Sequence, residues 1–221
     1  METLDAIRQR ASTRAFLDQP VDRGTIETLL EAARWAPSGV NTQPWQVAVV
    51  TGRAKEKLSE ALAAARASDT PDHPDYAYYP AAWQEPYKSR RKACGLALYQ
   101  SQGITLDDTQ GRKAAWLDNY HFFGAPAGLL FFVDKALATG SWVDMGMFIQ
   151  NVMLAAVDRG LATCPQASLA EYPDIVRAML HIPAQRTLVC GMSLGYADPS
   201  AAVNRYRTAR VAVDTFTQWH D

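Results

Sequence analysis

Arginines near both ends of the chain are spaced in a way that suits the binding of an anion. Arg10, Ser12 and Arg14 are separated by single residues, and in an extended segment side chains two positions apart point the same way. Two guanidinium groups and a hydroxyl on one side can bind a phosphate, with bidentate geometry at each guanidinium. Arg207 and Arg210 in the basic tail could complete such a site. The alternative in both places is a solvated basic segment.

The segment 36–45, APSGVNTQPW, collects amide and hydroxyl groups between two apolar stretches. Asn41 and Gln43 each offer a donor and an acceptor, which suits a flat ring with alternating C=O and N–H groups. Gly39 lets the backbone approach a ligand closely. An ordinary helix-to-strand turn explains the same residues about as well.

Two further segments carry weaker signs of binding. In TCPQAS, residues 163–168, Pro165 predicts a turn whose following N–H groups could face a ligand. Residues 69–87 form a proline-rich stretch that suits neither helix nor strand, and a long ordered loop of this kind is often functional. Its rings could stack on an aromatic ligand or simply pack on one another. The rings are those of Tyr76, Tyr78, Tyr79, Trp83 and Tyr87.

Composition and missing motifs exclude several classes of protein. Hydrophobic residues make up 48% and charged residues 20%, with a net charge of −1, so neither nucleic acid nor an anionic membrane is an expected partner. Glycine motifs for dinucleotides or nucleoside triphosphates, a hydrolase nucleophile motif and paired metal-ligand histidines are all missing from the sequence. No metal site is therefore expected. Three scattered cysteines and an N-terminus without an apolar signal core lead us to expect a cytoplasmic protein.

Hydrophobic periodicity predicts helices and strands that do not alternate strictly, and hence an α+β fold in a single domain, 1–221. The apolar helix 141–160 is expected at the centre of the fold or in a subunit interface, with Gly160 just past its end. Asp22 or Thr25 is expected to cap the second helix. The predicted helices are 3–10, 22–36, 53–68, 88–102, 108–121 and 141–160, and the predicted strands are 46–51, 127–133 and 186–197.

The order of these segments resembles the FMN-dependent nitroreductase family over almost the whole chain. The most specific part is A-P-S-G-x-N-x-Q-P-W, preceded by R-x-S-x-R and followed by GLATCPQAS, GMSLGY and a basic tail. The middle of the chain is most similar to the nitrobenzoate-reductase-like branch. The resemblance implies a small central mixed or antiparallel sheet surrounded by helices, in an intertwined homodimer with FMN at the subunit interface.

The resemblance also implies roles for individual residues. Arg10 would hold the phosphate, Ser12 the phosphate or ribityl chain, and Arg14 the ribityl and pyrimidine side. The partner chain would cover the rings with Pro37, Ser38, Gly39 and Asn41. Further contacts would come from Asn119, Pro165, Gln166, Ala167, Ser168, Arg207 and Arg210. Many family members carry Lys at position 14, and others carry an acidic residue and Gly at positions 167 and 168.

The function implied by the resemblance is reduction of nitroaromatic or quinone-like acceptors. NADH or NADPH would pass a hydride to flavin N5, and the acceptor would then take its place in a ping-pong cycle. No side-chain acid or base is required; Arg14 would supply electrostatic support. Tyr79, Trp83 and Tyr87 would bind the acceptor. Arg90 and Arg91 either attract a carboxylated nitroarene or form a solvated helix face.

Three alternatives remain open at this stage. Another flavin reductase of the same fold would carry out ene reduction or reductive dehalogenation. A non-catalytic flavin-binding protein would bind FMN without turnover. An α+β dimer without flavin would do neither.

Overall fold

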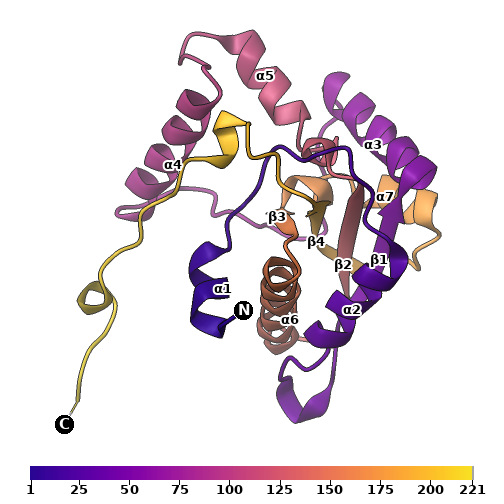
Figure 1. The fold of residues 1–221 in the computed structure, drawn as a ribbon. Helices are drawn as coiled ribbons and strands as arrows, with labels where there is room; N and C mark the ends of the chain where they lie inside the picture. The colour runs from indigo at the N-terminus through magenta and orange to yellow at the C-terminus, as the bar shows by residue number, and fades with distance from the viewer. Residues whose placement is uncertain (221) are drawn as a thin grey trace.

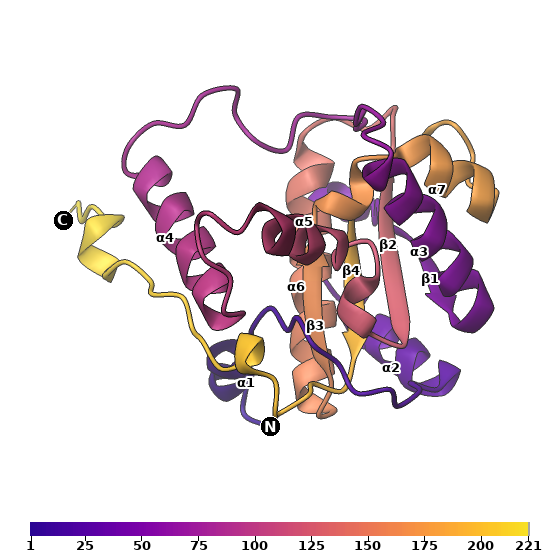
Figure 2. The same ribbon diagram turned by 90° about the horizontal axis from the view of Figure 1, so that it is seen from above.

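The computed structural model describes residues 1–220, which form a four-stranded sheet and its covering helices (Figures 1 and 2). All strand pairs are antiparallel, in the order β1-β2-β4-β3. The strands are β1 (Gln46–Thr51), β2 (Ala127–Asp134), β3 (Ala162–Gln166) and β4 (Arg186–Gly195). The helices are α1 (Thr3–Gln9), α2 (Arg23–Ala33), α3 (Gly52–Ala67), α4 (Tyr87–Ser101), α5 (Thr109–Leu117), α6 (Gly140–Asp158) and α7 (Pro173–Leu180). The predicted α+β class is confirmed.

Alternation along the central strand β2 creates two hydrophobic cores. Leu129 and Phe131 pack with α2 and α6 on one face of the sheet, while Leu130 and Phe132 pack with α3 and α7 on the other. Successive strand residues point to opposite faces, so an unbroken apolar run is what a strand covered on both faces requires. Truncating any one of these buried side chains to alanine should cost about 2–5 kcal/mol.

The two helix ends predicted from sequence have the expected caps. Asp22 accepts a hydrogen bond from the N–H of Thr25 at 2.9 Å, so it is Asp22 that caps α2. Gly160 follows α6 with a φ of +70°, a conformation that glycine adopts at little cost. The helix α6 lies along one face of the sheet, as expected for a helix at the centre of the fold (Figure 2).

The structure contains two elements that were not predicted from the sequence, β3 and α7, and the helix α5 is shorter than predicted. Residues 162–166 form strand β3, although Pro165 predicted a turn there; β3 is an edge strand, where proline is tolerated. The helix α7 carries a recognisable start, since Pro173 occupies its first turn. The predicted helix 108–121 ends at Leu117, where the side chain of Asn119 donates to the carbonyl of Trp116.

The aromatic stretch 69–86 is an irregular segment, as predicted, but its first half is fixed to the sheet. Asp75 pairs with Arg177 at 2.7 Å and also accepts from the N–H of Leu188 at 2.9 Å. Tyr76 donates its hydroxyl proton to the carbonyl of Val189 at 2.6 Å. This segment therefore starts from a rigid base beside β4 before it crosses to α4.

No helix within residues 1–220 has both the length and the hydrophobicity that a membrane crossing requires.

We predict that replacing Asp75 with asparagine lowers the free energy of unfolding by about 3 kcal/mol at pH 7. The change would leave the largely buried guanidinium of Arg177 without its counter-charge. Chemical denaturation measures the difference, and Asp214→Asn on the exposed tail is the control, with an expected effect below about 0.5 kcal/mol.

The same pair predicts a dependence on pH. Burial opposes ionisation of Asp75, but hydrogen bonds from Arg177 and Leu188 outweigh it and lower the pKa of this carboxyl. A lowered pKa stabilises the fold above the unfolded-state pKa of about 3.9, and that contribution is lost as the pH falls through the folded-state pKa. The difference in free energy of unfolding between wild type and Asp75→Asn should therefore become smaller in acid. A difference that does not change with pH would contradict this account.

Candidate anion and cofactor site

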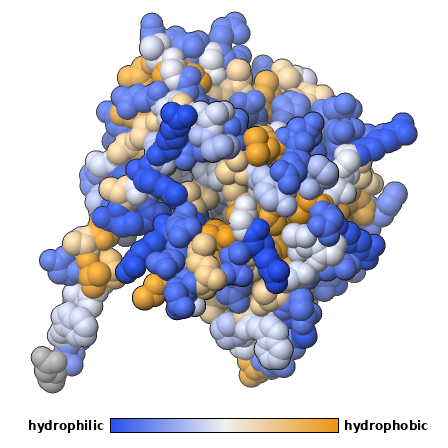
Figure 3. All heavy atoms as spheres, in the orientation of Figure 1, coloured by the Kyte–Doolittle hydropathy of each residue, from blue (hydrophilic) through white to orange (hydrophobic). Residues whose placement is uncertain are grey.

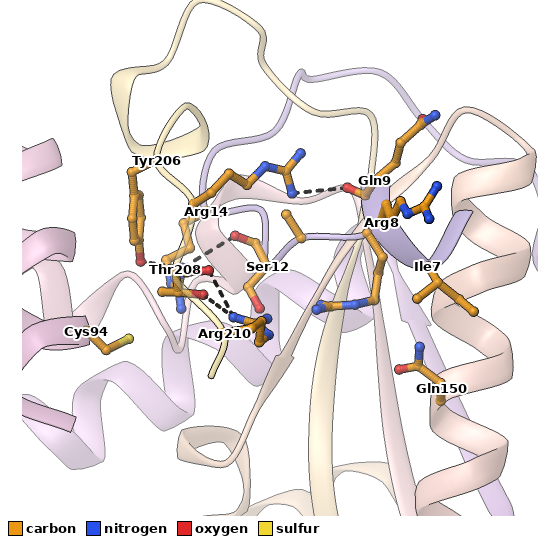
Figure 4. A pocket seen from close by; sticks show the side chains of 13 residues that line it. Ile7, Arg8, Gln9, Ser12, Arg14, Cys94, Gln150, Tyr206, Thr208 and Arg210 are labelled. Carbon is orange, nitrogen blue, oxygen red and sulfur yellow. Dashed lines mark hydrogen bonds between the residues drawn. The ribbon is translucent and has the colours of Figure 1, made fainter. Parts of the chain in front are cut away.

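A cavity of about 790 Å³ lies between α1, the extended segment after it, α4 and the C-terminal tail. Figure 4 shows α4 entering on one side with Cys94, and α6 on the other with Gln150. The lining residues are Ile7, Arg8, Gln9, Arg10, Ala11, Ser12, Arg14, Cys94, Gln150, Tyr206, Arg207, Thr208 and Arg210. The cavity therefore joins the two ends of the chain, as the arginine spacing suggested.

Alternation of side chains along the extended segment brings Arg10, Ser12 and Arg14 together. Ser12 forms a parallel bridge with Thr163 of β3, and the N–H of Thr13 donates to the Thr163 carbonyl at 3.0 Å. The side chain of Thr13 is buried, while its neighbours on either side line the cavity. Arg10, Ser12 and Arg14 thus line one cavity, and Ala11 between them lines it as well.

Among residues 1–220, five arginines and no acidic side chain line the cavity. Within residues 1–220, none of the five forms a salt bridge. Arg14 instead donates to the Tyr206 hydroxyl at 3.2 Å, Arg207 to the Gln9 carbonyl at 3.1 Å, and Arg210 to the Thr208 hydroxyl at 2.7 Å (Figure 4). Neutral acceptors orient these guanidinium groups without neutralising them.

The uncompensated positive charge shifts the pKa values of groups in the site. Burial lowers the pKa of Arg10, and the positive charges of Arg210 and Arg207 lower it further. Burial also raises the pKa of the Cys164 thiol, although the nearby Arg14 and Arg10 favour its ionised form. A dianion such as a phosphate would relieve the repulsion among the arginines, so the geometry indicates a phosphate site.

Sequence reasoning missed part of this lining. Arg8 also lines the cavity, but it lies in the last turn of α1, where the two-residue spacing of an extended segment does not apply. Cys94, Gln150, Tyr206 and Thr208 come from distant segments, and no local pattern points to them.

A second polar group surrounds the end of β3. The amide of Gln166 donates to the Asn119 carbonyl at 2.8 Å, and Ser193 donates to its Oε1 at 2.5 Å. The Ser168 hydroxyl donates to Oδ1 of Asn119 at 3.2 Å. These bonds hold the buried Gln166 side chain inside the protein, and none of the residues 165–168 lines the arginine cavity.

The loop that carries Pro37, Ser38, Gly39 and Asn41 does not line the arginine cavity of its own chain. Val40, Asn41 and Gln43 all have φ between 45° and 59°, and such strain persists only where the surroundings fix it. The side chain of Asp144 in α6 accepts from the N–H of Gly39 at 3.3 Å. A further tie comes from the Ser38 hydroxyl, which accepts from the N–H of Gln43 at 3.0 Å. The Val40 side chain meanwhile is fully exposed.

The aromatic side chains of the long loop form a connected row. Tyr76 packs edge-on against Trp142 with ring centroids 4.4 Å apart, and Tyr78, Tyr79 and Trp83 follow at centroid separations of 6.2, 4.7 and 5.6 Å. Tyr78, Tyr79 and Tyr87 are all more than half exposed. The rings thus pack on one another and still offer surface to a ligand.

A model of the nitroreductase family matches residues 7–196. The chain belongs to the nitroreductase family. A 4-nitrobenzoate reductase of Pseudomonas putida is 40% identical over 213 residues, which cover 96% of this chain and 93% of that protein. A chloronitrobenzene nitroreductase of Comamonas testosteroni is 40% identical over 214 residues, covering 96% and 94%.

Solved structures of the nitroreductase family agree with this assignment. The FMN- and NADPH-dependent nitroreductase NfnB from Sphigopyxis sp. strain HMH superimposes with a TM-score of 0.96 at 41% identity, covering 100% of both chains. The family resemblance inferred from the motifs is confirmed, and so is the central antiparallel sheet with surrounding helices that it implied. Among residues 1–220 no group of three or more His, Cys, Asp or Glu side chains is arranged to hold a metal ion.

We predict that inorganic phosphate stabilises the FMN-free protein against heat, and that Arg10→Ala weakens the affinity for phosphate about tenfold. The loss of one charge-assisted hydrogen bond accounts for that factor. Thermal unfolding at increasing phosphate concentration measures the affinity. Arg53→Ala on the exposed side of α3 is the control; an equal loss in both variants would mean that phosphate acts only by general screening.

Proposed function

We propose that this chain is an NAD(P)H-dependent FMN nitroreductase that reduces nitroaromatic or quinone-like acceptors. The observation that carries the proposal is the arginine cavity, because five cations without a carboxylate suit the phosphate of FMN. The relatives' names support the same reading, since they describe reductases of nitrobenzoate and chloronitrobenzene and an enzyme dependent on FMN and NADPH.

The residues in the cavity fit FMN by their chemistry. Arg10, Arg207 and Arg210 would hold the phosphate, and Ser12 would hold the phosphate or the ribityl chain. Arg14 would lie towards the pyrimidine ring, where its charge stabilises negative charge gained on reduction. FMN, when bound, supplies the electron carrier that links nucleotide and acceptor, and the protein binds and orients it.

The end of β3 would provide the contacts around the flavin rings. Pro165 and Ala167 would contribute backbone, and the inward bonds of Gln166, Ser168 and Asn119 would hold that backbone still. One hydrogen of the Asn119 amide is committed to the carbonyl of Trp116, so a pyrimidine contact would use the other. No side chain is needed as a general acid or base in this arrangement.

A homodimer would complete the site, and the chain exposes the apolar surface that a dimer needs. The tail leads away from the sheet (Figure 1), with a few orange, hydrophobic spheres along it in Figure 3, and several of its large apolar side chains are exposed. These are Val211, Val213, Phe216 and Trp219, with Trp219 81% exposed. Leu4 of α1 and Val143 of α6 are similarly open. Pro37, Ser38, Gly39 and Asn41 would then cover the flavin of the other chain.

We further propose a single domain and a cytoplasmic location. Both hydrophobic clusters share strands β2 and β4, which supports one folding unit. Cys94, Cys164 and Cys190 are free thiols, which supports a reducing compartment.

The purified protein should show the visible absorption bands of oxidised flavin, and NADPH or NADH added without oxygen should bleach them. Nitrobenzene should then restore the bands. Flavin bands that neither nucleotide bleaches would instead support a non-catalytic flavin-binding protein. A colourless protein unable to bind FMN would refute both.

Replacing Arg14 with glutamine should shift the flavin midpoint potential by about 30 mV to more negative values. That shift corresponds to ~1.4 kcal/mol for a two-electron couple, the scale of one lost charge interaction. Arg14→Lys should shift the potential less, because lysine keeps the positive charge but lacks the planar, bidentate donor geometry of the guanidinium. Spectroelectrochemistry of the FMN-loaded variants measures it, and an unchanged potential in Arg14→Gln would rule out the electrostatic role.

A further inference from the structure

The first turns of α4 carry a concentration of positive charge that the proposed FMN site does not use. Lys88, Arg90, Arg91 and Lys92 lie within five residues, and α4 contains no acidic residue. The nearest acid in sequence is Glu85, and its carboxylate accepts a hydrogen bond from the N–H of Ser89 at 3.2 Å. Cations in the first turn of a helix are opposed by the helix dipole, so the stability of α4 does not explain them.

Two of these cations are held over aromatic rings. The guanidinium carbon of Arg91 lies 5.4 Å from the ring centre of Trp83, and that of Arg90 lies 5.7 Å from the ring centre of Tyr87. Neither forms a salt bridge within residues 1–220. A guanidinium stacked on a ring keeps its donor edge free, and its restricted motion lowers the entropy lost when it binds a carboxylate.

Arg90 and Arg91 lie on the same face of α4 as Cys94, one of the residues that line the arginine cavity. Tyr87, Arg90, Arg91 and Cys94 follow the i, i+3, i+4, i+7 spacing and therefore share one face of α4. Cys94 lines the cavity, so this face leads from the cavity to the aromatic row. Lys92 lies about 100° around the helix from Arg91, whereas Lys88 is three residues before Arg91 and adjoins the same face.

From this arrangement we infer that Arg90 and Arg91 select acceptors whose nitroaromatic ring carries a carboxylate. The ring would stack against Tyr79, Trp83 or Tyr87, and the carboxylate would pair with the guanidinium groups. The inference rests on the proposed function and narrows its substrate class. Sequence identity does not distinguish carboxylated from uncharged acceptors, because relatives named for nitrobenzoate and for the uncharged chloronitrobenzene are each 40% identical to the chain.

The test compares 4-nitrobenzoate with nitrobenzene as acceptors for the FMN-loaded enzyme. In wild type, kcat/KM should favour 4-nitrobenzoate. In the double variant Arg90→Gln, Arg91→Gln the ratio of the two kcat/KM values should fall about tenfold, or about threefold for each exposed guanidinium lost. The change should appear in KM for 4-nitrobenzoate, since the carboxylate takes no part in electron transfer.

The matched control is Lys88→Gln, Lys92→Gln. It removes two charges from the same helix but leaves the two guanidinium groups that lie over rings, so the acceptor ratio should change less than about twofold. An equal fall in the lysine variant would overturn the inference in favour of general electrostatic attraction. A fall in the NADPH to NADH preference of the arginine variant, with the acceptor ratio unchanged, would overturn it in favour of the nucleotide phosphate.

Calorimetry separates this inference from the proposed function. Binding of 4-nitrobenzoate to the oxidised, FMN-loaded protein requires no nucleotide and no turnover, and the arginine variant should bind it about tenfold more weakly. Nitrobenzene reduction by wild type with equal 4-nitrobenzoate binding in both proteins would refute the carboxylate site alone. Arginine-dependent binding without any reductase activity would refute the proposed function alone.

Discussion

The short parallel pairing of the segment after α1 with β3 is the constraint on which the site depends. One backbone bond, from Thr13 to Thr163, fixes the segment in an extended conformation beside the sheet edge. Extension makes side chains alternate, so Thr13 enters the protein while Arg10, Ser12 and Arg14 face the cavity. Asn204 holds the next stretch by accepting from the Arg14 N–H and donating to the Ala15 carbonyl, each at 2.8 Å. Both ends of the chain are thereby tied to one edge of the sheet.

This arrangement brings unfavourable interactions with it. Burial lowers the pKa of Arg10, and the positive charges of Arg210 and Arg207 lower it further, so these like charges oppose one another. The hydroxyl of Thr163, buried beneath the same segment, has no hydrogen-bond partner within residues 1–220, a defect that costs about 1–3 kcal/mol. The two hydrophobic cores on either side of β2 and β4 supply the stability that offsets these costs. A bound dianion would turn the repulsion into attraction.

The sequence predicted features that depend on local periodicity. Short, continuous apolar runs identified three of the four strands, and the heavily apolar pattern of residues 141–160 placed α6 at the centre. The fourth strand was missed because Pro165 is a turn residue in most settings, and only the strand's edge position makes proline acceptable there. The arginine side of the site was predictable from single-residue spacing. The bonds that turn Gln166 inward come from Asn119 and Ser193, which are 47 and 27 residues away in sequence, so no local pattern could reveal them.

In the proposed dimer, cofactor binding and subunit association would each favour the other. The loop that contains Gly39 is held in a strained shape by Asp144 and Ser38, yet the Val40 side chain has nothing to pack on within its own chain. The exposed tail presents a similar situation, since Arg207 and Arg210 line the cavity and the apolar side chains of Val211, Val213 and Phe216 beyond them are exposed. Burying the apolar residues of the tail against a second chain would fix the positions of the arginines. Neutralising the arginines with a phosphate would remove the repulsion among them where the tail begins. A ligand that binds only the assembled form stabilises that form by mass action, so FMN and the partner chain would each strengthen the binding of the other.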